Sequence, residues 1–324
     1  MGTTDEYRII AAGAGWTDKR SRGRLRIDGG DAAAFLHALV SNDVRSLPPG
    51  GGAYTTLLTP QGRLIADLVA YRADDHWLID TPPGLAGPLA ARLDASIFTE
   101  DVRLADVSAA LGQIAVVGPR AAGAAAAATG VSTAALEALA VRAHVVAGEA
   151  RIARTDDTAF PSFDLFVPAA ATGGVVAALT AWGAAPMSPA LAEALRIDAG
   201  RPAFGIDMTD ETIPLEAGLL DRAISLTKGC YVGQEVIVRI LHRGGGRVAK
   251  RLVRLLLDSD AAAPPPAGAE IAGDRGERGH VTSAAVSPAT GRVVALGYVN
   301  RDAAEVGRRV RVQGVGAEIV GLAG

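Results

Sequence analysis

The pattern of the chain changes near residue 245, and this change limits the folds that it can adopt. Before that point, strand-like alternation, as at 24–28, is mixed with helix-like periodicity, as at 190–200. After it, short β-type runs follow one another, separated by Pro, Gly and Asp. Such a succession of short strands is typical of a small sandwich or barrel. We therefore predict an α+β body at residues 1–245 and a β domain at residues 246–324.

Within the body, several elements can be predicted individually. Residues 57–71 read as a hairpin with its turn at Pro60-Gln61-Gly62, and 173–183 read as a helix ended by Gly183. The alanine-rich stretch 121–130 predicts a helix that faces solvent.

The totals restrict the partners. The chain has 324 residues with a formal net charge of −3 and only 4% aromatic residues, so we do not expect nucleic acid as a partner. No run of eighteen apolar residues occurs, and the N-terminus lacks the order of a signal peptide. One cysteine excludes an internal disulfide and a zinc site with two thiolates. We expect a cytoplasmic protein with no membrane partner and no resident metal.

The densest chemistry lies in the octapeptide KGCYVGQE, residues 228–235. Two glycines flank the stretch from Cys230 to Val232, and Lys228 precedes the thiol by two residues. A nearby cation favours thiolate, the nucleophilic and metal-binding form of cysteine. From the residues alone, a buried structural cysteine in a turn is an equally good interpretation.

This octapeptide, preceded by RIDAGRPAFGIDMTDETIPLEAGL, resembles the YgfZ family of folate-binding proteins, relatives of the glycine-cleavage aminomethyltransferase. FLHALVSNDV at 35–44, with LLTPQGRLIADL at 57–68, is similar to the N-terminal pattern of that family. GHVTSAAVSP at 279–288, with ALGYV at 295–299, is similar to its closing pattern.

The resemblance implies two interleaved ferredoxin-like subdomains around a central cavity, followed by a C-terminal β-barrel. One subdomain would comprise about 1–105 with 190–245, and the other 106–189. The cavity would hold tetrahydrofolate or one of its one-carbon derivatives.

The resemblance also implies two acidic site residues. Asp198 of RIDAG stands where the transferases have a glutamate that holds the pterin, although its side chain is one methylene shorter. Asp67 matches one member of a double acid that serves the reactive folate nitrogens, and Ala66 replaces the other. An equally good interpretation of Asp67 is a solvent-facing position on an alternating strand.

We further assign cofactor binding to Lys228, Tyr231 and Gln234 of the octapeptide and to Arg239 and Arg243 beyond it. The last two belong to a basic run that could hold the glutamate tail of folate or an acidic partner. Lys250 to Arg254 are interpreted as a solvated strand face.

Three functions follow from these residues. The main one is a tetrahydrofolate-binding accessory protein that supports assembly or repair of iron–sulfur clusters in client proteins through Cys230. The transferases' Tyr-Thr-Gly segment is missing at 154–168 and the octapeptide is present, which favours this function. The second is a folate-dependent one-carbon transferase, in which Asp67 moves protons. The third is an RNA-interacting role in tRNA modification. Whether any reaction is catalysed stays open.

Overall fold

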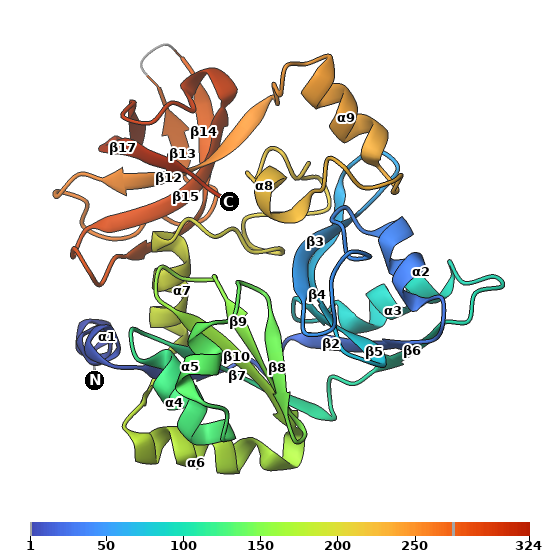
Figure 1. Ribbon diagram of the computed structural model, residues 1–324. Coiled ribbons are helices and arrows are strands. Elements are labelled where there is room, and N and C mark those ends of the chain that lie inside the picture. Colours follow the sequence, from blue (N-terminus) through green and yellow to red (C-terminus); the bar gives the residue numbers. More distant parts are fainter. Residues whose placement is uncertain (1, 274–275) are drawn as a thin grey trace.

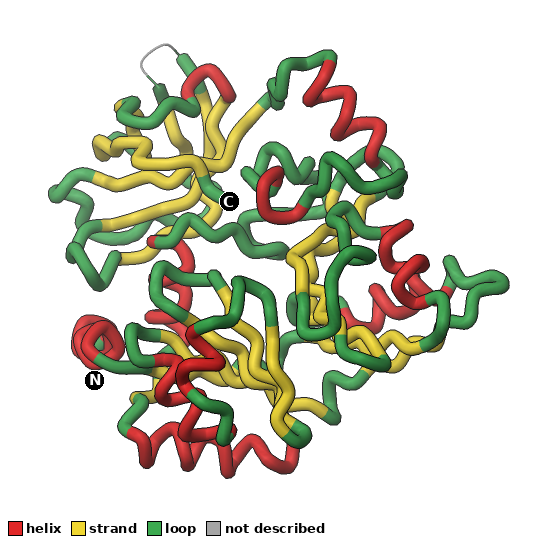
Figure 2. The backbone as a smooth tube through the Cα atoms, in the orientation of Figure 1, coloured by secondary structure: helices red, strands yellow, loops and turns green. Residues whose placement is uncertain are grey.

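The structure, a computed structural model, describes residues 2–273 and 276–324. Two sheets with helices on their outer faces and one closed barrel are arranged around a common centre (Figure 1). Figure 2 shows that most helices lie at the margin and the strands nearer the middle. The predicted α+β class with a C-terminal β-barrel is confirmed.

The first sheet has five antiparallel strands in the order β3-β4-β5-β2-β6. Helices α2 and α3 contribute to the core on one of its faces. The bounds are β2 Gly23–Asp28, α2 Ala32–Leu39, β3 Gly52–Leu58, β4 Leu64–Arg72, β5 His76–Thr81, α3 Ala86–Asp94 and β6 Arg103–Asp106.

Strands β3 and β4 form the hairpin predicted at 57–71. Side chains alternate across a strand, so β4 serves two faces. Leu68 and Ala70 belong to the core under α2 and α3, whereas Val69 and Tyr71 pack toward the second sheet. By the same alternation Asp67 points away from the helices, toward the space between the sheets.

The second sheet has six strands in the order β11-β1-β7-β10-β9-β8. Strand β1 comes from the N-terminal end of the chain and pairs with β7, so the two sheets are interleaved in sequence. The bounds are α1 Thr3–Ala12, β1 Gly15–Asp18, β7 Leu111–Val117, α4 Ala121–Thr129, α5 Thr133–Glu137, β8 His144–Ala147, β9 Ala150–Thr155, β10 Ser162–Pro168, η1 Ala169–Ala171, α6 Thr172–Trp182 and β11 Ala185–Pro186.

The alanine-rich helix α4 corrects one prediction, because it does not face solvent. Ala121, Ala124 and Ala125 are fully buried and belong to the core of the second sheet, which also holds side chains of β7 and β10. Small side chains let the helix backbone approach the sheet and α6 closely. The alanines are therefore a packing surface. The helix at 173–183 does end at Gly183, as predicted.

The C-terminal strands close a barrel in the order β12-β15-β14-β13-β16-β17. Helices α7, α8 and α9 connect the second sheet to it (Figure 1). The bounds are α7 Pro189–Asp198, α8 Leu220–Ala223, α9 Gln234–His242, β12 Lys250–Leu257, β13 Glu270–Ala272, β14 Arg278–Val286, β15 Val293–Asn300, η2 Arg301–Ala303, β16 Arg309–Val312 and β17 Val315–Leu322. No helix in the described part of the chain is long and apolar enough to cross a membrane.

The barrel is fixed to the body through buried polar contacts. The fully buried side chain of Asp207 accepts hydrogen bonds from Thr282 Oγ1 at 2.5 Å and Ser283 Oγ at 2.7 Å. It also pairs with Arg196 at 2.6 Å. Breaking either side of this contact would leave a buried charge without its partners, so the seam is expected to open only on unfolding.

Gly218 lies at the same seam and makes its packing testable. Its φ is +76°, and a Cβ there would lie 1.8 Å from the carbonyl oxygen of Ala323. Gly130 has the same φ of +76° but open space around it. We expect Gly130→Ala to cost about 1 kcal/mol of folding free energy. Gly218→Ala should cost about 2 kcal/mol more, since the C-terminus must move. Urea unfolding of both variants measures this, and equal losses would contradict a close-packed seam.

Candidate functional site

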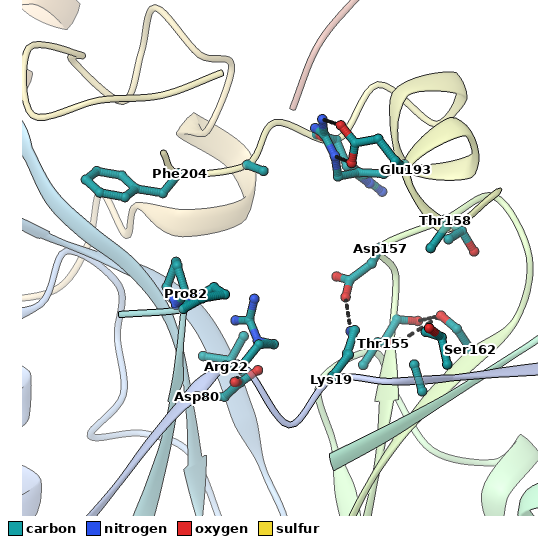
Figure 3. A pocket seen from close by; sticks show the side chains of 18 of the residues that line it. Lys19, Arg22, Asp80, Pro82, Thr155, Asp157, Thr158, Ser162, Glu193 and Phe204 are labelled. Atoms are coloured by element: carbon teal, nitrogen blue, oxygen red, sulfur yellow. Dashed lines mark hydrogen bonds and ion pairs between the residues drawn. The ribbon is translucent and has the colours of Figure 1, made fainter. Parts of the chain in front are cut away.

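A cavity of about 510 Å³ lies between the two sheets, with α7 and residues 201–206 along its rim. This volume is in the range of small-molecule sites. Figure 3 shows Pro82, Arg22 and Asp80 on the side of the first sheet, with Asp157 and Lys19 on the side of the second.

Asp67 lies in the wall of this cavity. The residue is 8% exposed. Tyr54 Oη donates a hydrogen bond of 2.8 Å to Oδ2, while the buried Oδ1 has no hydrogen-bond partner among the described residues. Burial raises the pKa of the Asp67 carboxyl, and the Tyr54 hydrogen bond and the Arg22 charge offset part of that rise. A carboxylate with one free oxygen and a raised pKa is suited to accept a proton.

Tyr54 is held in place by two guanidinium groups. Arg222 lies 5.0 Å and Arg142 5.8 Å from the centre of its ring. Burial raises the pKa of Tyr54 well above its ordinary value, so the hydroxyl stays protonated and keeps donating to Asp67. The arrangement fixes which carboxylate oxygen remains free.

Arginines accumulate on the same side of the cavity. Asp156 pairs with Arg222 at 3.0 Å and with Arg201 at 3.2 Å, and it also contacts Arg142. Arg142 in turn pairs with Asp157 at 2.9 Å. Three guanidinium groups thus share two carboxylates, and the surplus positive charge can receive an anionic part of a ligand.

The cavity floor is a polar network that joins the two sheets. Arg22 pairs with Asp80 at 2.7 Å, and Lys19 pairs with Asp157 and Asp164 at 3.1 Å (Figure 3 shows the Lys19–Asp157 contact). Gln113 Nε2 donates to Asp80 at 3.3 Å and to Asp164 at 2.9 Å. These partners come from both sheets, so the network sets their separation.

The predicted pterin ligand Asp198 is placed elsewhere. From α7, the cavity wall includes Pro189, Ala192, Glu193 and Arg196, and the last two pair at 2.6 Å. Asp198 follows Glu193 by five positions, about 140° around the helix. Its carboxylate accepts a hydrogen bond of 2.8 Å from Ser287 Oγ of the barrel. This placement argues against the predicted pterin contact, because helix geometry turns the side chain toward the barrel.

The octapeptide also lies outside the cavity lining. The Lys228 ammonium donates to the carbonyl groups of Val40 at 2.5 Å, of Asn42 at 3.3 Å and of His37. It lies 5.1 Å from the Tyr231 ring, and burial lowers the pKa of Lys228 to about 8. Lys228 is thus committed to backbone carbonyls, and its role as a cofactor ligand stays a prediction.

The other residues of the predicted site separate into two places. Tyr231 is buried in an apolar core with Leu58 and Leu64, away from the cavity lining, whereas Cys230 is exposed. Gln234 begins α9, and Arg239 and Arg243 line a shallow groove on that helix. Of the predicted residues, the structure brings only Asp67 into the cavity.

Sequence reasoning missed most of the cavity. The charged and hydroxyl lining residues it did not single out include Lys19, Arg22, Tyr54, Asp80, Arg142, Asp157, Glu193, Arg196, Arg201 and Arg222, and it also missed Asp156, which pairs with Arg201. One signal was available: Asp156-Asp157 lies in the segment 154–168, which was considered only for the motif it lacks. The described part of the chain has no group of three His, Cys, Asp or Glu side chains that could hold a metal ion.

Comparisons with known proteins agree with this architecture. Residues 1–228 match the GCVT N-terminal domain, and residues 250–320 match the glycine cleavage T-protein C-terminal barrel domain. The aminomethyltransferase of Corynebacterium jeikeium is 32% identical over 94% of this chain and 83% of the relative. That of Streptomyces coelicolor is 29% identical over 98% and 85%.

A solved structure shows the same fold. The crystal structure of glycine cleavage system aminomethyltransferase T from Bartonella henselae has a TM-score of 0.88 with 23% sequence identity. The likeness covers 98% of this chain and 88% of that one. Together with the two matched domains, which span most of the sequence, these relatives show that the chain belongs to the glycine cleavage T-protein family.

Proposed function

We propose that the chain binds a reduced folate in the cavity between the two sheets and that Asp67 moves protons there during one-carbon transfer. The observation that carries the proposal is the buried Asp67 carboxylate, with one oxygen held by Tyr54 and the other free. The names of the relatives, aminomethyltransferases, support this one-carbon function over the iron–sulfur role expected from the octapeptide.

The residues of the cavity fit such a ligand. A reduced pterin has a planar pyrimidine ring with N–H donors, and the free Asp67 oxygen is an acceptor without a partner. Val69, Val117 and Phe204 supply apolar wall, and the arginines around Asp156 suit a carboxylate tail. When bound, the folate supplies the nitrogen that carries the one-carbon unit.

The chemistry of the chain itself rests on Asp67. Its raised pKa makes the carboxylate a better proton acceptor than an ordinary aspartate, and the Tyr54 hydrogen bond occupies Oδ2 and leaves Oδ1 without a protein partner.

Calorimetric titration of tetrahydrofolate tests the ligand and its position. We expect binding in the micromolar range, weakened about tenfold or more by Asp67→Asn, a loss of about 1.4 kcal/mol. Asp198→Asn is the matched control, since that carboxylate faces Ser287, and its affinity should stay within about twofold. The resemblance alone would predict the opposite order. A loss at Asp198 without one at Asp67 would contradict the proposed pterin position.

The ionised Asp67 carboxylate should also destabilise the ligand-free protein. Its folded-state pKa is raised above the ordinary value of 3.8 by burial, so the folded state binds the proton more tightly than the unfolded chain. Stability therefore falls as pH rises from about 4 through the folded pKa. We expect Asp67→Asn to raise the melting temperature at pH 7 and to give no gain near pH 3. A melting temperature that is unchanged or lower at pH 7 would show that the ionised carboxylate is well compensated.

A second function, the support of iron–sulfur proteins by a YgfZ-type thiol, is favoured by one observation: Cys230 is exposed on a segment that Lys228 anchors. One thiolate cannot hold a cluster alone, so any cluster would be shared with a client or assembly protein.

The single thiol separates this function from folate chemistry. Because it does not line the cavity, Cys230→Ser should leave tetrahydrofolate affinity within about twofold of the original protein. In cells that lack the gene, the same variant should fail to restore iron–sulfur enzyme activity. Asp67→Asn is the companion variant, which tests in the same assay whether folate binding is also needed. Full restoration by Cys230→Ser would rule out the second function.

A further inference from the structure

The segment 229–249 lies between the two regions that match the family. Those two domains therefore do not account for it, although it contains α9 and most of the octapeptide. Figure 1 shows α9 at the margin of the molecule, between the barrel and the first sheet. A separate role for this segment has to be sought in its own side chains.

Helix α9 has one apolar and one polar face. Ile237 is buried, and Ile240 and Leu241 pack against the core that holds Leu58 and Leu64. The other side lines a groove of about 410 Å³, which we name the α9 groove. Its residues are Glu235, Val236, Val238, Arg239, His242 and Arg243.

The α9 groove lies in the most basic stretch of the chain. Residues 234–251 carry five Lys or Arg side chains and one carboxylate, a net +4 in a chain whose total is −3. Many arginines of this protein are paired, yet within residues 2–273 and 276–324 no ion pair forms at Arg239, Arg243 or Arg247. An uncompensated basic strip on an acidic molecule attracts an anionic partner.

We propose that the α9 groove is a docking site for an acidic segment of a partner protein. Val236 and Val238 give the groove an apolar floor between the cations, as protein interfaces require. No Phe, Tyr or Trp is among the described residues that line it, so it lacks the large stacking platform of single-stranded nucleic acid sites. The apolar face of α9 is already buried in the core, so the helix cannot lie in a membrane surface by that face.

The charges along α9 also specify the segment it accepts. Arg239 and Arg243 are one turn apart, about 5–6 Å between Cβ atoms. They match two carboxylates one helical turn apart, or at alternate positions of a strand. Glu235 precedes Arg239 by one turn in the same row and repels a third carboxylate at that end of the groove.

A photo-reactive side chain in place of Val238, which is 37% exposed, tests the proposal in cells of the protein's own species. We expect a cross-linked product that resists ribonuclease and contains a peptide with two carboxylates within five residues. Its yield should fall about tenfold or more with Arg239→Glu and Arg243→Glu together, because the charge is reversed. Arg92→Glu is the matched control: Arg92 is an exposed arginine in the last turn of α3 and should leave the yield unchanged.

The other outcomes overturn the proposal. They are a ribonuclease-sensitive product, a lipid adduct, a yield that survives charge reversal, or no product at all. The proposal does not depend on folate binding, and calorimetry separates the two. Tetrahydrofolate should bind the double variant within about twofold of the original affinity, since neither arginine lines the cavity.

Discussion

The buried amide of Gln113 is the contact on which the arrangement of the two sheets depends. It is fully buried on β7, and its Nε2 donates to Asp80 of the first sheet and to Asp164 of the second. Arg24 Nη1 donates to its Oε1 at 3.2 Å, which fixes the orientation of the amide. Hydrogen bonds to charged groups contribute about 1.5–3 kcal/mol each, and an unpaired buried carboxylate costs more. The separation of the sheets, and with it the width of the cavity, is therefore set by polar geometry in addition to apolar packing.

Burying carboxylates beside this network costs folding free energy unless each one is paired. Asp80 is satisfied by Arg22 and Gln113, so it is well compensated. Asp67 has only the Tyr54 hydroxyl as a direct partner and keeps one oxygen free. Both carboxylates lie in the same cavity, but their environments differ: Asp80 helps to hold the sheets together, whereas Asp67 keeps one oxygen without a protein partner. Such a difference between neighbouring titratable groups is typical of sites that move protons.

The sequence was sufficient for the fold class because alternation, turn residues and the change near residue 245 are local signals. It was not sufficient to predict which side chains are buried. The pattern around Asp67 shows which face of a strand it occupies, but whether that face meets solvent or a second sheet depends on contacts distant in sequence. The contact of Asp198 with Ser287 was hidden for a related reason, since its motif does not reveal which neighbour a helix turns each side chain toward. The composition of α4 is compatible with a solvent-facing helix, and its alanines are buried only because the helix packs against the neighbouring sheet. The cavity arginines carry no local signal, because solvated arginines are common everywhere.

Most residues of the octapeptide have a structural role, and Cys230 does not. Lys228 is explained by the backbone carbonyls it contacts, since a compact ammonium with three donors can serve several of them where a planar guanidinium cannot. Tyr231 is explained by its core, and Gly233 by a φ of +84° and the carbonyl oxygen of Thr59, 2.5 Å from where a Cβ would lie. These residues hold the turn that starts α9. Cys230 has no such explanation, because it is exposed and supports no core. The turn therefore presents a thiol that the fold itself does not need, next to a helix whose outer face is basic.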